Sequence, residues 1–316
     1  MIFVLGPTAS GKSALSMALA QRYPSEIISV DSALVFREMN IGSAKPSTAD
    51  LAQVPHHLIN LIDPSQSYSA AQFASDAAQA HRDITARNKL ALFVGGTMLY
   101  VSALNQGFDN LPGANAQLRA QLDAQAKALG WPAMHERLIE LDPISAARLQ
   151  PTDSQRIQRA LEVIELTGRT LSSQQTNGKI GIAGSNNAHL IISLEPSDRL
   201  ALHARIEQRL KSMYSAGFID EVRLLKTRGD LTQDMPSMRC VGYRQIWQAI
   251  ADAPNASNAD IEKSSFESSL IATRQLCKRQ LTWLRASQQR HVFDCLHNTE
   301  KLIDSVSRLI DNYIKK

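Results

Sequence analysis

The feature that most constrains this chain is a loop close to its start, residues 6–13, with the sequence Gly-Pro-Thr-Ala-Ser-Gly-Lys-Ser. It has the pattern G-x-x-x-x-G-K-[ST] of a phosphate-binding loop. An apolar run, residues 2–5, precedes it, and a helical pattern of apolar residues follows it. In this strand–loop–helix setting, backbone N–H groups converge on an anion. The sequence therefore predicts a site for a di- or triphosphate.

Two side chains of the loop extend this prediction. Lys12 adds a positive charge beside the phosphates, and the hydroxyl of Ser13 can hold Mg²⁺, the one cofactor that the sequence predicts. The predicted diphosphate- or nucleotide-binding residues of the loop are Gly6, Pro7, Thr8, Ala9, Ser10, Gly11, Lys12 and Ser13.

The arrangement of apolar runs predicts an α/β fold. Strand-like runs at residues 27–30 and 90–94 alternate with helical patterns, one of which begins at an N-cap, Ser69. Such alternation is typical of a parallel sheet whose ligands lie at the carboxyl ends of its strands. We therefore expect a parallel sheet core like that of P-loop NTPases.

The segment from residue 111 to about 187 has a different character, because helical periodicity dominates it and strand patterns are absent. It includes a helix predicted from Thr152 or Asp153 to Gly168. Strand character returns at residues 189–194, and a single long helix is predicted from Ser197 to about Gly229, followed by helices with a break near residues 253–259. These patterns predict a core of residues 1–110 and 188–316, with a helical domain, residues 111–187, inserted into it.

Composition excludes some classes of protein. The 316 residues carry a net charge of +4, so any strongly basic surface must be local. No apolar run is long enough for a membrane helix, and the start of the chain does not resemble a signal peptide. Cys240, Cys277 and Cys295 lack the spacing of a zinc site. We expect a cytoplasmic protein with reduced thiols and no membrane partner.

Asp31 directly follows the predicted strand at residues 27–30. Two roles suit a carboxylate at this place. It can order water around Mg²⁺ bound to Ser13, or it can accept a proton as a general base. Both roles require a carboxylate near the phosphates, so the spacing leaves both open.

The strand predicted at residues 90–94 leads to Gly95, Gly96 and Thr97, where an ATPase would carry an acidic residue. Hydrolysis of ATP or GTP usually requires a second carboxylate for Mg²⁺, so its absence disfavours that reaction. Glycine lets the backbone approach a ligand closely, and the Thr97 hydroxyl can donate to an oxygen. Thr97 also suits the N-cap of the following helix, and the two roles are compatible.

Basic residues gather in the second half of the chain. Arg239 lies in the segment 239–244 and can hold a phosphate or form surface ion pairs. Between residues 274 and 290 there are five cations and no acidic residue, with Trp283 among them. Such a face suits a nucleic-acid backbone, and the alternative is a solvated helix with Trp283 in the core. The five cations are Arg274, Lys278, Arg279, Arg285 and Arg290. His56 and His57 are not expected to bind metal, because no third ligand is near.

Taken together, these motifs resemble one family, the bacterial tRNA dimethylallyltransferases, also called tRNA isopentenyl transferases. The resemblance covers most of the chain, and its motifs occur in order, which makes the set far more specific than the phosphate loop alone. The matching segments are 6–13, 31–34, 41–46, 55–58, 68–70, 94–97, 153, 155–156, 159–163, 239–245, 272–275, 278–280 and 282–285.

The resemblance implies transfer of the dimethylallyl group of dimethylallyl diphosphate to the exocyclic amine of an adenine on the 3′ side of a tRNA anticodon. The family's tRNAs read codons that begin with U. Asp31 is then the general base, and Thr97 binds the bridging oxygen of the leaving group. Lys12, Ser13 with Mg²⁺, and Arg239 stabilise the diphosphate. A phosphate loop without an ATPase carboxylate fits this reaction, because no phosphoryl group is transferred.

The resemblance also implies a surface for the anticodon stem-loop, over which the inserted domain closes, in a chain that we expect to be a monomer. The target base must be extruded to reach the site. The predicted tRNA-binding residues are Asp31, Ser32, Ala33, Leu34, Thr97, Arg119, Gln155, Arg156, Ile157, Gln158, Arg159, Arg239, Cys240, Val241, Gly242, Tyr243, Arg244, Lys278, Arg279, Gln280, Leu281, Thr282, Trp283, Leu284 and Arg285.

Two other classes of protein share some of these features. A nucleotide or small-molecule kinase has the phosphate loop and often an aspartate after the second strand, but it leaves the basic segment and the large insertion unexplained. A non-catalytic RNA-binding module with a structural nucleotide leaves Asp31 and Thr97 without roles.

Overall fold

The structure is a computed structural model that describes residues 1–106, 111–175, 189–286 and 289–315. It divides into two compact units, a core unit of Met1–Leu104 with Ser185–Lys316 and a helical unit of Asn105–Gly184. The first predicted boundary, at residue 110, differs from this division by a few residues, and the second, at residue 187, lies outside the described residues.

A six-stranded sheet forms the centre of the core unit, and every pair of neighbouring strands in it is parallel, as the fold class predicted. The spatial order of the strands is β3-β2-β4-β1-β5-β6. The strands are β1 (Ile2–Leu5), β2 (Ser25–Val30), β3 (His56–His57), β4 (Leu90–Gly95), β5 (Leu190–Glu195) and β6 (His291–Asp294). The two edge strands, β3 and β6, were missed, because they are short and carry no apolar run.

Both faces of the central strands are buried, which explains why β1 and β4 are continuous apolar runs. Ile2 and Val4 of β1 share one hydrophobic cluster with Leu15 and Leu19 of α1. Phe3, between them, points the other way and stacks on Phe93 of β4, with ring centroids 4.9 Å apart. Successive side chains of a strand face opposite sides, so helices must cover both faces.

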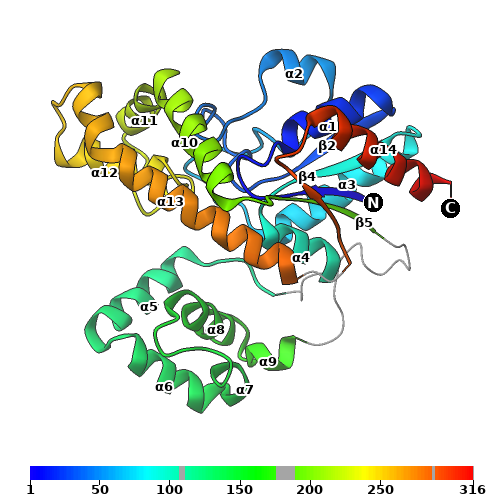
Figure 1. Cartoon of the computed structure of the whole chain (residues 1–316). Helices are drawn as coiled ribbons and strands as arrows, with labels where there is room; N and C mark the ends of the chain where they lie inside the picture. Colours follow the sequence, from blue (N-terminus) through cyan, green and yellow to red (C-terminus); the bar gives the residue numbers. More distant parts are fainter. Residues whose placement is uncertain (107–110, 176–188, 287–288, 316) are drawn as a thin grey trace. The chain divides into compact units, whose positions relative to one another are not determined.

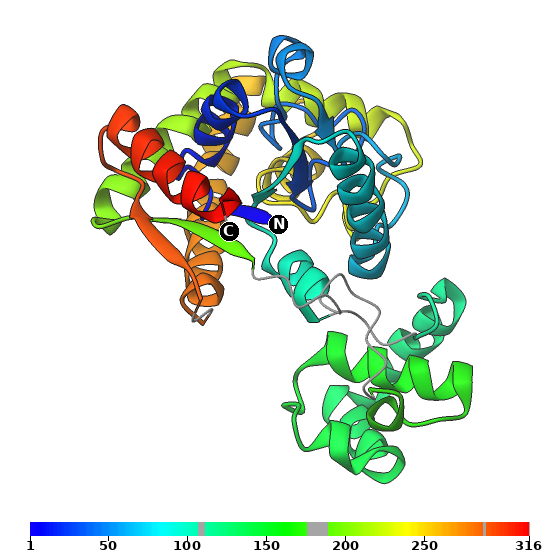
Figure 2. The same ribbon diagram turned by 90° about the vertical axis from the view of Figure 1, so that its right-hand side faces the viewer.

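The helices that cover the sheet lie where this alternation requires. Helix α1 packs against α14 on one side, and α3 packs against β2 and β4 on the other (Figures 1 and 2). Ser69 caps α3 as predicted, in a capping box with Gln72. The helices of this layer and its loops are α1 (Lys12–Arg22), α2 (Thr48–Gln53), α3 (Ala70–Ala86), α4 (Met98–Gln106) and α14 (Thr299–Ile314).

A layer of four further helices adjoins the carboxyl ends of the strands, with α13 running along α10 (Figure 1). The prediction of one long helix up to Gly229 is wrong. Gly217 has φ +96°, a left-handed conformation that ends one helix and starts the next. The four helices are α10 (Arg199–Ser215), α11 (Phe218–Thr227), α12 (Tyr243–Asp252) and α13 (Asn258–Ala286). None of the described helices is long and apolar enough to cross a membrane.

The helical unit has a small hydrophobic core of its own, and its described elements are all helices, which agrees with the lack of strand patterns in its sequence. Helix α8 begins after the N-cap Asp153 and ends at Gly168, as predicted, because Gly168 adopts φ +67°. Its helices are α5 (Ala116–Leu129), α6 (Trp131–Leu141), α7 (Pro143–Ala146), α8 (Ser154–Thr167) and α9 (Leu171–Gln174).

One buried carboxylate in β2, Glu26, links stability to pH. Its oxygens accept hydrogen bonds from His57 at 2.7 Å, Arg87 at 2.7 Å and Lys89 at 3.0 Å. Burial alone would raise the pKa of Glu26, but these three bonds outweigh burial and lower it from 4.5 to about 2. The ionised form is therefore stabilised by folding, and this stabilisation is present above pH 4.5 and is lost as the pH falls towards 2.

We predict that Glu26→Gln lowers the free energy of unfolding at pH 7 by about 1–3 kcal/mol, because it weakens charged hydrogen bonds. It should also reduce the loss of stability that occurs as the pH falls from 4.5 towards 2. Urea unfolding at several pH values measures both effects. Glu267→Gln, which changes an exposed carboxylate of α13, is the control. If the Glu26 variant and the parent chain lost stability equally at low pH, Glu26 would not be a source of the pH-dependent stability.

Candidate active site

A cavity of about 600 Å³ lies at the carboxyl ends of β1, β2 and β4, and all of its lining residues belong to the core unit. Its wall includes Lys12 and Ser13 of the phosphate loop, Asp31 after β2, and Thr97 after β4. These residues are far apart in the sequence, but their strands are neighbours in the sheet. The structure thus brings together the loop, the carboxylate and the hydroxyl that the sequence singled out.

The phosphate loop has the conformation that its sequence requires. Ala9 and Gly11 have φ values of +62° and +83°, so the backbone turns sharply before α1. The Lys12 Nζ atom donates to the carbonyl of Pro7 at 2.7 Å. Burial and the neighbouring Arg209 guanidinium lower the pKa of Lys12 to about 8, while Asp31 acts in the opposite direction. A bound anion would place negative charge beside Lys12 and would therefore favour its protonated form.

Asp31 and Thr97 stand at the ends of adjacent strands and are fixed by local hydrogen bonds. The Asp31 Oδ1 atom accepts from the backbone N–H of Ala33 at 2.9 Å. The Thr97 Oγ1 atom accepts from the backbone N–H of Ser32 at 3.0 Å and lies 3.3 Å from the Ser32 hydroxyl, to which it donates. The Thr97 carbonyl also accepts from Tyr100, so this residue starts α4 while its side chain faces the segment after Asp31.

Three arginines line this cavity: Arg239, Arg209, and Arg279 of the predicted RNA-binding segment in α13. Arg239 was predicted, is exposed, and precedes α12. Arg209 of α10 was missed, and burial lowers its pKa while Asp31 raises it. It belongs to no motif, but it lies three residues after Ile206 and one before Leu210, both buried. That spacing places Arg209 on the buried side of α10, which is the only signal by which the sequence could have revealed it.

The segment that follows Asp31 is held in place by α11. The Glu221 carboxylate accepts from the backbone N–H groups of Asn40 at 2.8 Å, Ile41 at 2.7 Å and Gly42 at 3.2 Å, and from the Tyr243 hydroxyl at 2.5 Å. A Cβ atom at Gly42 would overlap the Phe218 ring, so only glycine fits there. Residues 42–44 line the cavity, so Glu221 fixes one of its walls.

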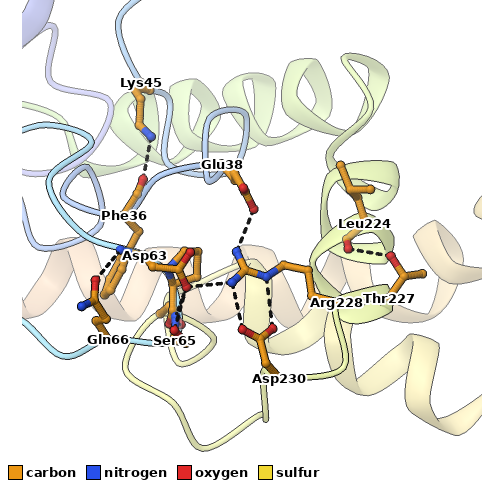
Figure 3. A network of polar contacts seen from close by, with 12 residues as sticks. Phe36, Glu38, Lys45, Asp63, Ser65, Gln66, Leu224, Thr227, Arg228 and Asp230 are labelled. Atoms are coloured by element: carbon orange, nitrogen blue, oxygen red, sulfur yellow. Dashed lines mark hydrogen bonds and ion pairs between the residues drawn. The ribbon is translucent and has the colours of Figure 1, made fainter.

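A second anchor holds the same segment further along, at Arg228 beyond the end of α11 (Figure 3). Its guanidinium bonds to Glu38 at 2.8 Å, Asp63 at 2.7 Å and Asp230 at 2.9 Å. In the same network Lys45 donates to the carbonyl of Phe36. The segment that leads to the cavity wall is therefore held by Glu221 of α11 and by Arg228, the residue after that helix.

We predict that Glu221→Ala lowers kcat/KM at least about tenfold, because about 2 kcal/mol of charged hydrogen bonding to the wall is lost. Glu221→Gln retains one acceptor oxygen and should give an intermediate value. Steady-state kinetics with a thermal unfolding midpoint for each variant test this, with Glu262→Ala at an exposed site of α13 as the control. Unchanged kinetics in the alanine variant would show that the wall does not depend on Glu221.

The predicted basic segment, which runs along α13 to Arg290, divides into four groups. Lys278, Thr282 and Trp283 are exposed, and Trp283 retains 49% of its accessible surface, so the alternative that placed it in the core is wrong. Leu281 and Leu284 are buried, so we remove them from the predicted RNA surface. Arg274, Arg285 and Arg290 form ion pairs with Glu207 or Glu195. Arg279 and Gln280 line the cavity.

The segment 239–244 divides in a similar way. Cys240 and Val241 line the cavity beside Arg239, and Arg244 is exposed. Gly242 and Tyr243 are buried, and the Tyr243 ring packs on Phe218 with centroids 4.9 Å apart. Tyr243 lines the cavity from a buried position, and Gly242 is buried beside the Phe218 ring, so we remove both from the predicted exposed RNA surface.

The predicted tRNA-binding residues of the helical unit differ in how far their side chains are exposed. Ile157 is completely buried, so its side chain is excluded from RNA contact. The buried Glu162 carboxylate accepts two hydrogen bonds from Arg119, each 2.9 Å long, and one from Arg159. These arginines remain half-buried, so one edge of each faces solvent. The remaining members are Gln155 and Arg156, which are exposed, and Gln158, which bonds to Asp123.

The oxygen donors of the cavity suit Mg²⁺. The Ser13 hydroxyl and the Asp31 carboxylate both line it, and hydroxyl and carboxylate oxygens are the hard ligands that Mg²⁺ prefers, with water and substrate phosphates completing the shell. Within the described residues there is no group of three or more His, Cys, Asp or Glu side chains that could bind a metal by itself. His57 lies 2.7 Å from the Glu26 carboxylate.

Comparisons with known proteins bear on this site. A family model described as IPP transferase matches residues 34–287. A tRNA dimethylallyltransferase of Paraburkholderia xenovorans is 53% identical over 97% of this chain and 96% of its own length, and one of Cupriavidus taiwanensis is 52% identical over 98% and 95%. The crystal structure of a tRNA isopentenylpyrophosphate transferase from Bacillus halodurans is similar, with a TM-score of 0.69, 33% identity, and coverage of 99% of this chain and 96% of that one.

Proposed function

Because the chain belongs to the IPP transferase family, we propose that it is a tRNA dimethylallyltransferase. The donor is dimethylallyl diphosphate, and the acceptor is the exocyclic N6 amine of the adenosine on the 3′ side of the anticodon, in tRNAs that read codons beginning with U. The observation that carries the proposal is the single cavity lined by the phosphate loop, Asp31 and Thr97.

The leaving group determines what the phosphate loop does in this reaction. The bond between the allylic carbon and the bridging oxygen breaks, and the electron pair leaves with diphosphate. Negative charge therefore grows on the oxygens, and fixed positive charges and N–H dipoles stabilise it. Lys12, Arg209 and Arg239 surround the cavity for this task, and Thr97 donates its hydroxyl to the bridging oxygen. No phosphoryl group moves, so a second acidic residue after β4 is not needed.

The acceptor amine is a weak nucleophile, because its lone pair is delocalised into the adenine ring. As the new bond between nitrogen and the allylic carbon forms, the amine loses a proton, and Asp31 accepts it. General-base help of this kind contributes about 10²–10⁴-fold to a rate. Ser32, Ala33 and Leu34, which follow Asp31 along the cavity wall, contact the extruded adenine.

The Ser13 hydroxyl, with Asp31 through water, would hold Mg²⁺, which would supply positive charge to the diphosphate. The anticodon stem-loop contacts Lys278, Thr282, Trp283 and Arg244 of the core unit. In the helical unit it contacts Gln155, Arg156 and the exposed edges of Arg119 and Arg159. The chain acts as a monomer, and the helical unit closes over the bound stem-loop.

The test is incubation with unmodified tRNA and Mg²⁺, together with either dimethylallyl diphosphate or ATP. We expect a mass gain of one dimethylallyl group per tRNA with the first donor. Mapping by nuclease digestion should locate the group on the adenosine next to the anticodon. Turnover of ATP without modification of the tRNA would support a kinase and defeat the proposal.

We also predict that the affinity for anticodon stem-loop RNA falls steeply with salt, because lysine and arginine release counterions from phosphates. Lys278→Ala should reduce the slope of log K against log salt by about 1. Fluorescence anisotropy over a range of salt concentrations measures both. Lys301→Ala, at an exposed position of α14, is the control. An affinity that does not depend on salt would exclude the exposed face of α13 as the contact.

A further inference from the structure

One side chain of α13 joins two loops that the proposed reaction uses. The Gln280 Oε1 atom accepts from the backbone N–H of Thr8 in the phosphate loop at 2.9 Å. Its Nε2 atom donates to the backbone carbonyl of Gly96, next to Thr97, at 3.0 Å. These partners lie 272 and 184 residues away in the sequence. A glutamine amide has a donor at one end and an acceptor at the other, so it can bridge an N–H and a carbonyl.

The loops approach each other closely at position 96, and a side chain there would displace the Gln280 amide. A Cβ atom there would overlap the Gln280 Nε2 atom and lie 3.0 Å from the Gly6 carbonyl oxygen. Gly96 is thus in contact with both the amide of α13 and the start of the phosphate loop. The glycine after β4 is explained by this contact, which the sequence pattern alone did not indicate.

The backbone N–H groups of the loop after β4 form hydrogen bonds on the side away from the phosphate loop. The N–H groups of Gly96 and Thr97 both donate to the carbonyl of Val30, at 3.2 and 3.1 Å, which ties Thr97 to the strand that carries Asp31. The bridge through Gln280 ties it in the other direction, to the loop that carries Lys12 and Ser13. Thr97 is therefore held between the carboxylate on one side and the phosphate-binding groups on the other.

We propose that Gln280 is a positioning residue that sets the distance between the phosphate loop and Thr97. This inference rests on the proposed function, in which Lys12 and Ser13 bind the outer oxygens of the diphosphate while Thr97 binds the bridging oxygen. Both contacts must be made to one leaving group at once, and a misplacement of about 1 Å can lower a rate about 10²-fold. The polar atoms of Gln280 are already bonded to the two loops, so it does not read a base of the tRNA, as its exposed neighbours Lys278 and Thr282 can.

The test is a double-mutant cycle on kcat with Gln280→Met and Thr97→Val, at saturating anticodon stem-loop RNA and dimethylallyl diphosphate. Methionine has a similar length but cannot bridge the loops, and we expect it to lower kcat about 10²-fold. If Gln280 acts through Thr97, the double variant should be about as slow as Thr97→Val alone, because the two effects are coupled. The dissociation constant for the stem-loop RNA should stay within about twofold. Gln275→Met, on an exposed position of the same helix, is the control and should leave kcat unchanged.

Independent effects that multiply in the double variant would overturn the inference. So would a loss of RNA affinity at unchanged kcat, which would make Gln280 an RNA contact. Gln280→Glu keeps the acceptor for Thr8 but loses the donor for Gly96, and it replaces the methionine variant in the cycle if that variant does not fold. The parent chain, measured in the same assay, distinguishes a failure of the proposed function from a failure of the inference about Gln280. No dimethylallyl transfer by the parent defeats the proposed function, whereas transfer at the parent rate by the Gln280 variants defeats only this inference.

Discussion

Replacing Asp31 by alanine is expected to lower kcat by about 10²–10⁴-fold, because the adenine amine loses the group that accepts its proton. Asp31 lines the cavity after β2, and its Oδ1 atom is held by the N–H of Ala33. Asp31→Asn keeps this hydrogen bond and the side-chain volume but removes the base, so it should be about as slow as the alanine variant. Single-turnover transfer to anticodon stem-loop RNA measures the effect.

The design separates chemistry from binding. The affinity of both Asp31 variants for the stem-loop should stay close to that of the parent chain, because most of the binding energy comes from phosphate contacts. Asp83→Asn, at an exposed position of α3, is the matched control and should be fully active. An asparagine variant with near-normal turnover would rule out Asp31 as the base. Lost RNA affinity with normal single-turnover rates would instead assign Asp31 to recognition.

The second large effect is expected at Arg209, the cation that only the structure revealed. Arg209→Gln should lower kcat by about 10²–10³-fold, the range found when one group that stabilises a developing oxyanion is removed. Burial disfavours the charged form of Arg209, and Asp31 favours it, as the direction of each influence on its pKa indicates. A positive charge kept in such a place is available to the diphosphate without reorganisation.

A measurement of diphosphate binding distinguishes this role from a structural one. Arg209→Gln should bind diphosphate more weakly, as seen in product inhibition, while its thermal unfolding midpoint stays near that of the parent chain. The conservative change Arg209→Lys keeps the positive charge and should therefore retain part of the activity. Lys211→Gln, an exposed cation two residues further along α10, is the control. If Arg209→Gln transfers dimethylallyl groups at the parent rate, the charge at this position has no part in the reaction.

Local chemistry in the sequence was enough to predict the centre of the site. The strand–loop–helix pattern around residues 6–13 requires the turn seen at Ala9 and Gly11. Asp31 directly follows β2, and Thr97 lies two residues after the end of β4. Parallel strands end at one edge of a sheet, so the three features had to converge. Capping residues such as Ser69 and Asp153 set helix ends because they satisfy N–H groups that the helix itself leaves unpaired.

The predicted RNA surface was less accurate, because a motif does not say which face of a helix is buried. Leu281 and Leu284 lie in the same motif as Trp283, but the first two pack into the core and the third faces solvent. Ile157 lies between two exposed or half-exposed neighbours and is completely buried for the same reason. At 3.6 residues per turn, neighbouring positions of a helix point in different directions, and only packing decides which direction is inward.

The sequence by itself determined the phosphate loop, the parallel sheet, the positions of Asp31 and Thr97, and the resemblance to the IPP transferase family. Only the tertiary structure decided which distant groups complete the cavity: Arg209 from α10, Glu221 beneath the segment 40–42, and Gln280 between Thr8 and Gly96. The physical reason is the range of the forces involved. Turns, caps and strand ends depend on neighbours in the chain, whereas a buried charge or a bridging amide depends on partners that only the packing of distant helices supplies.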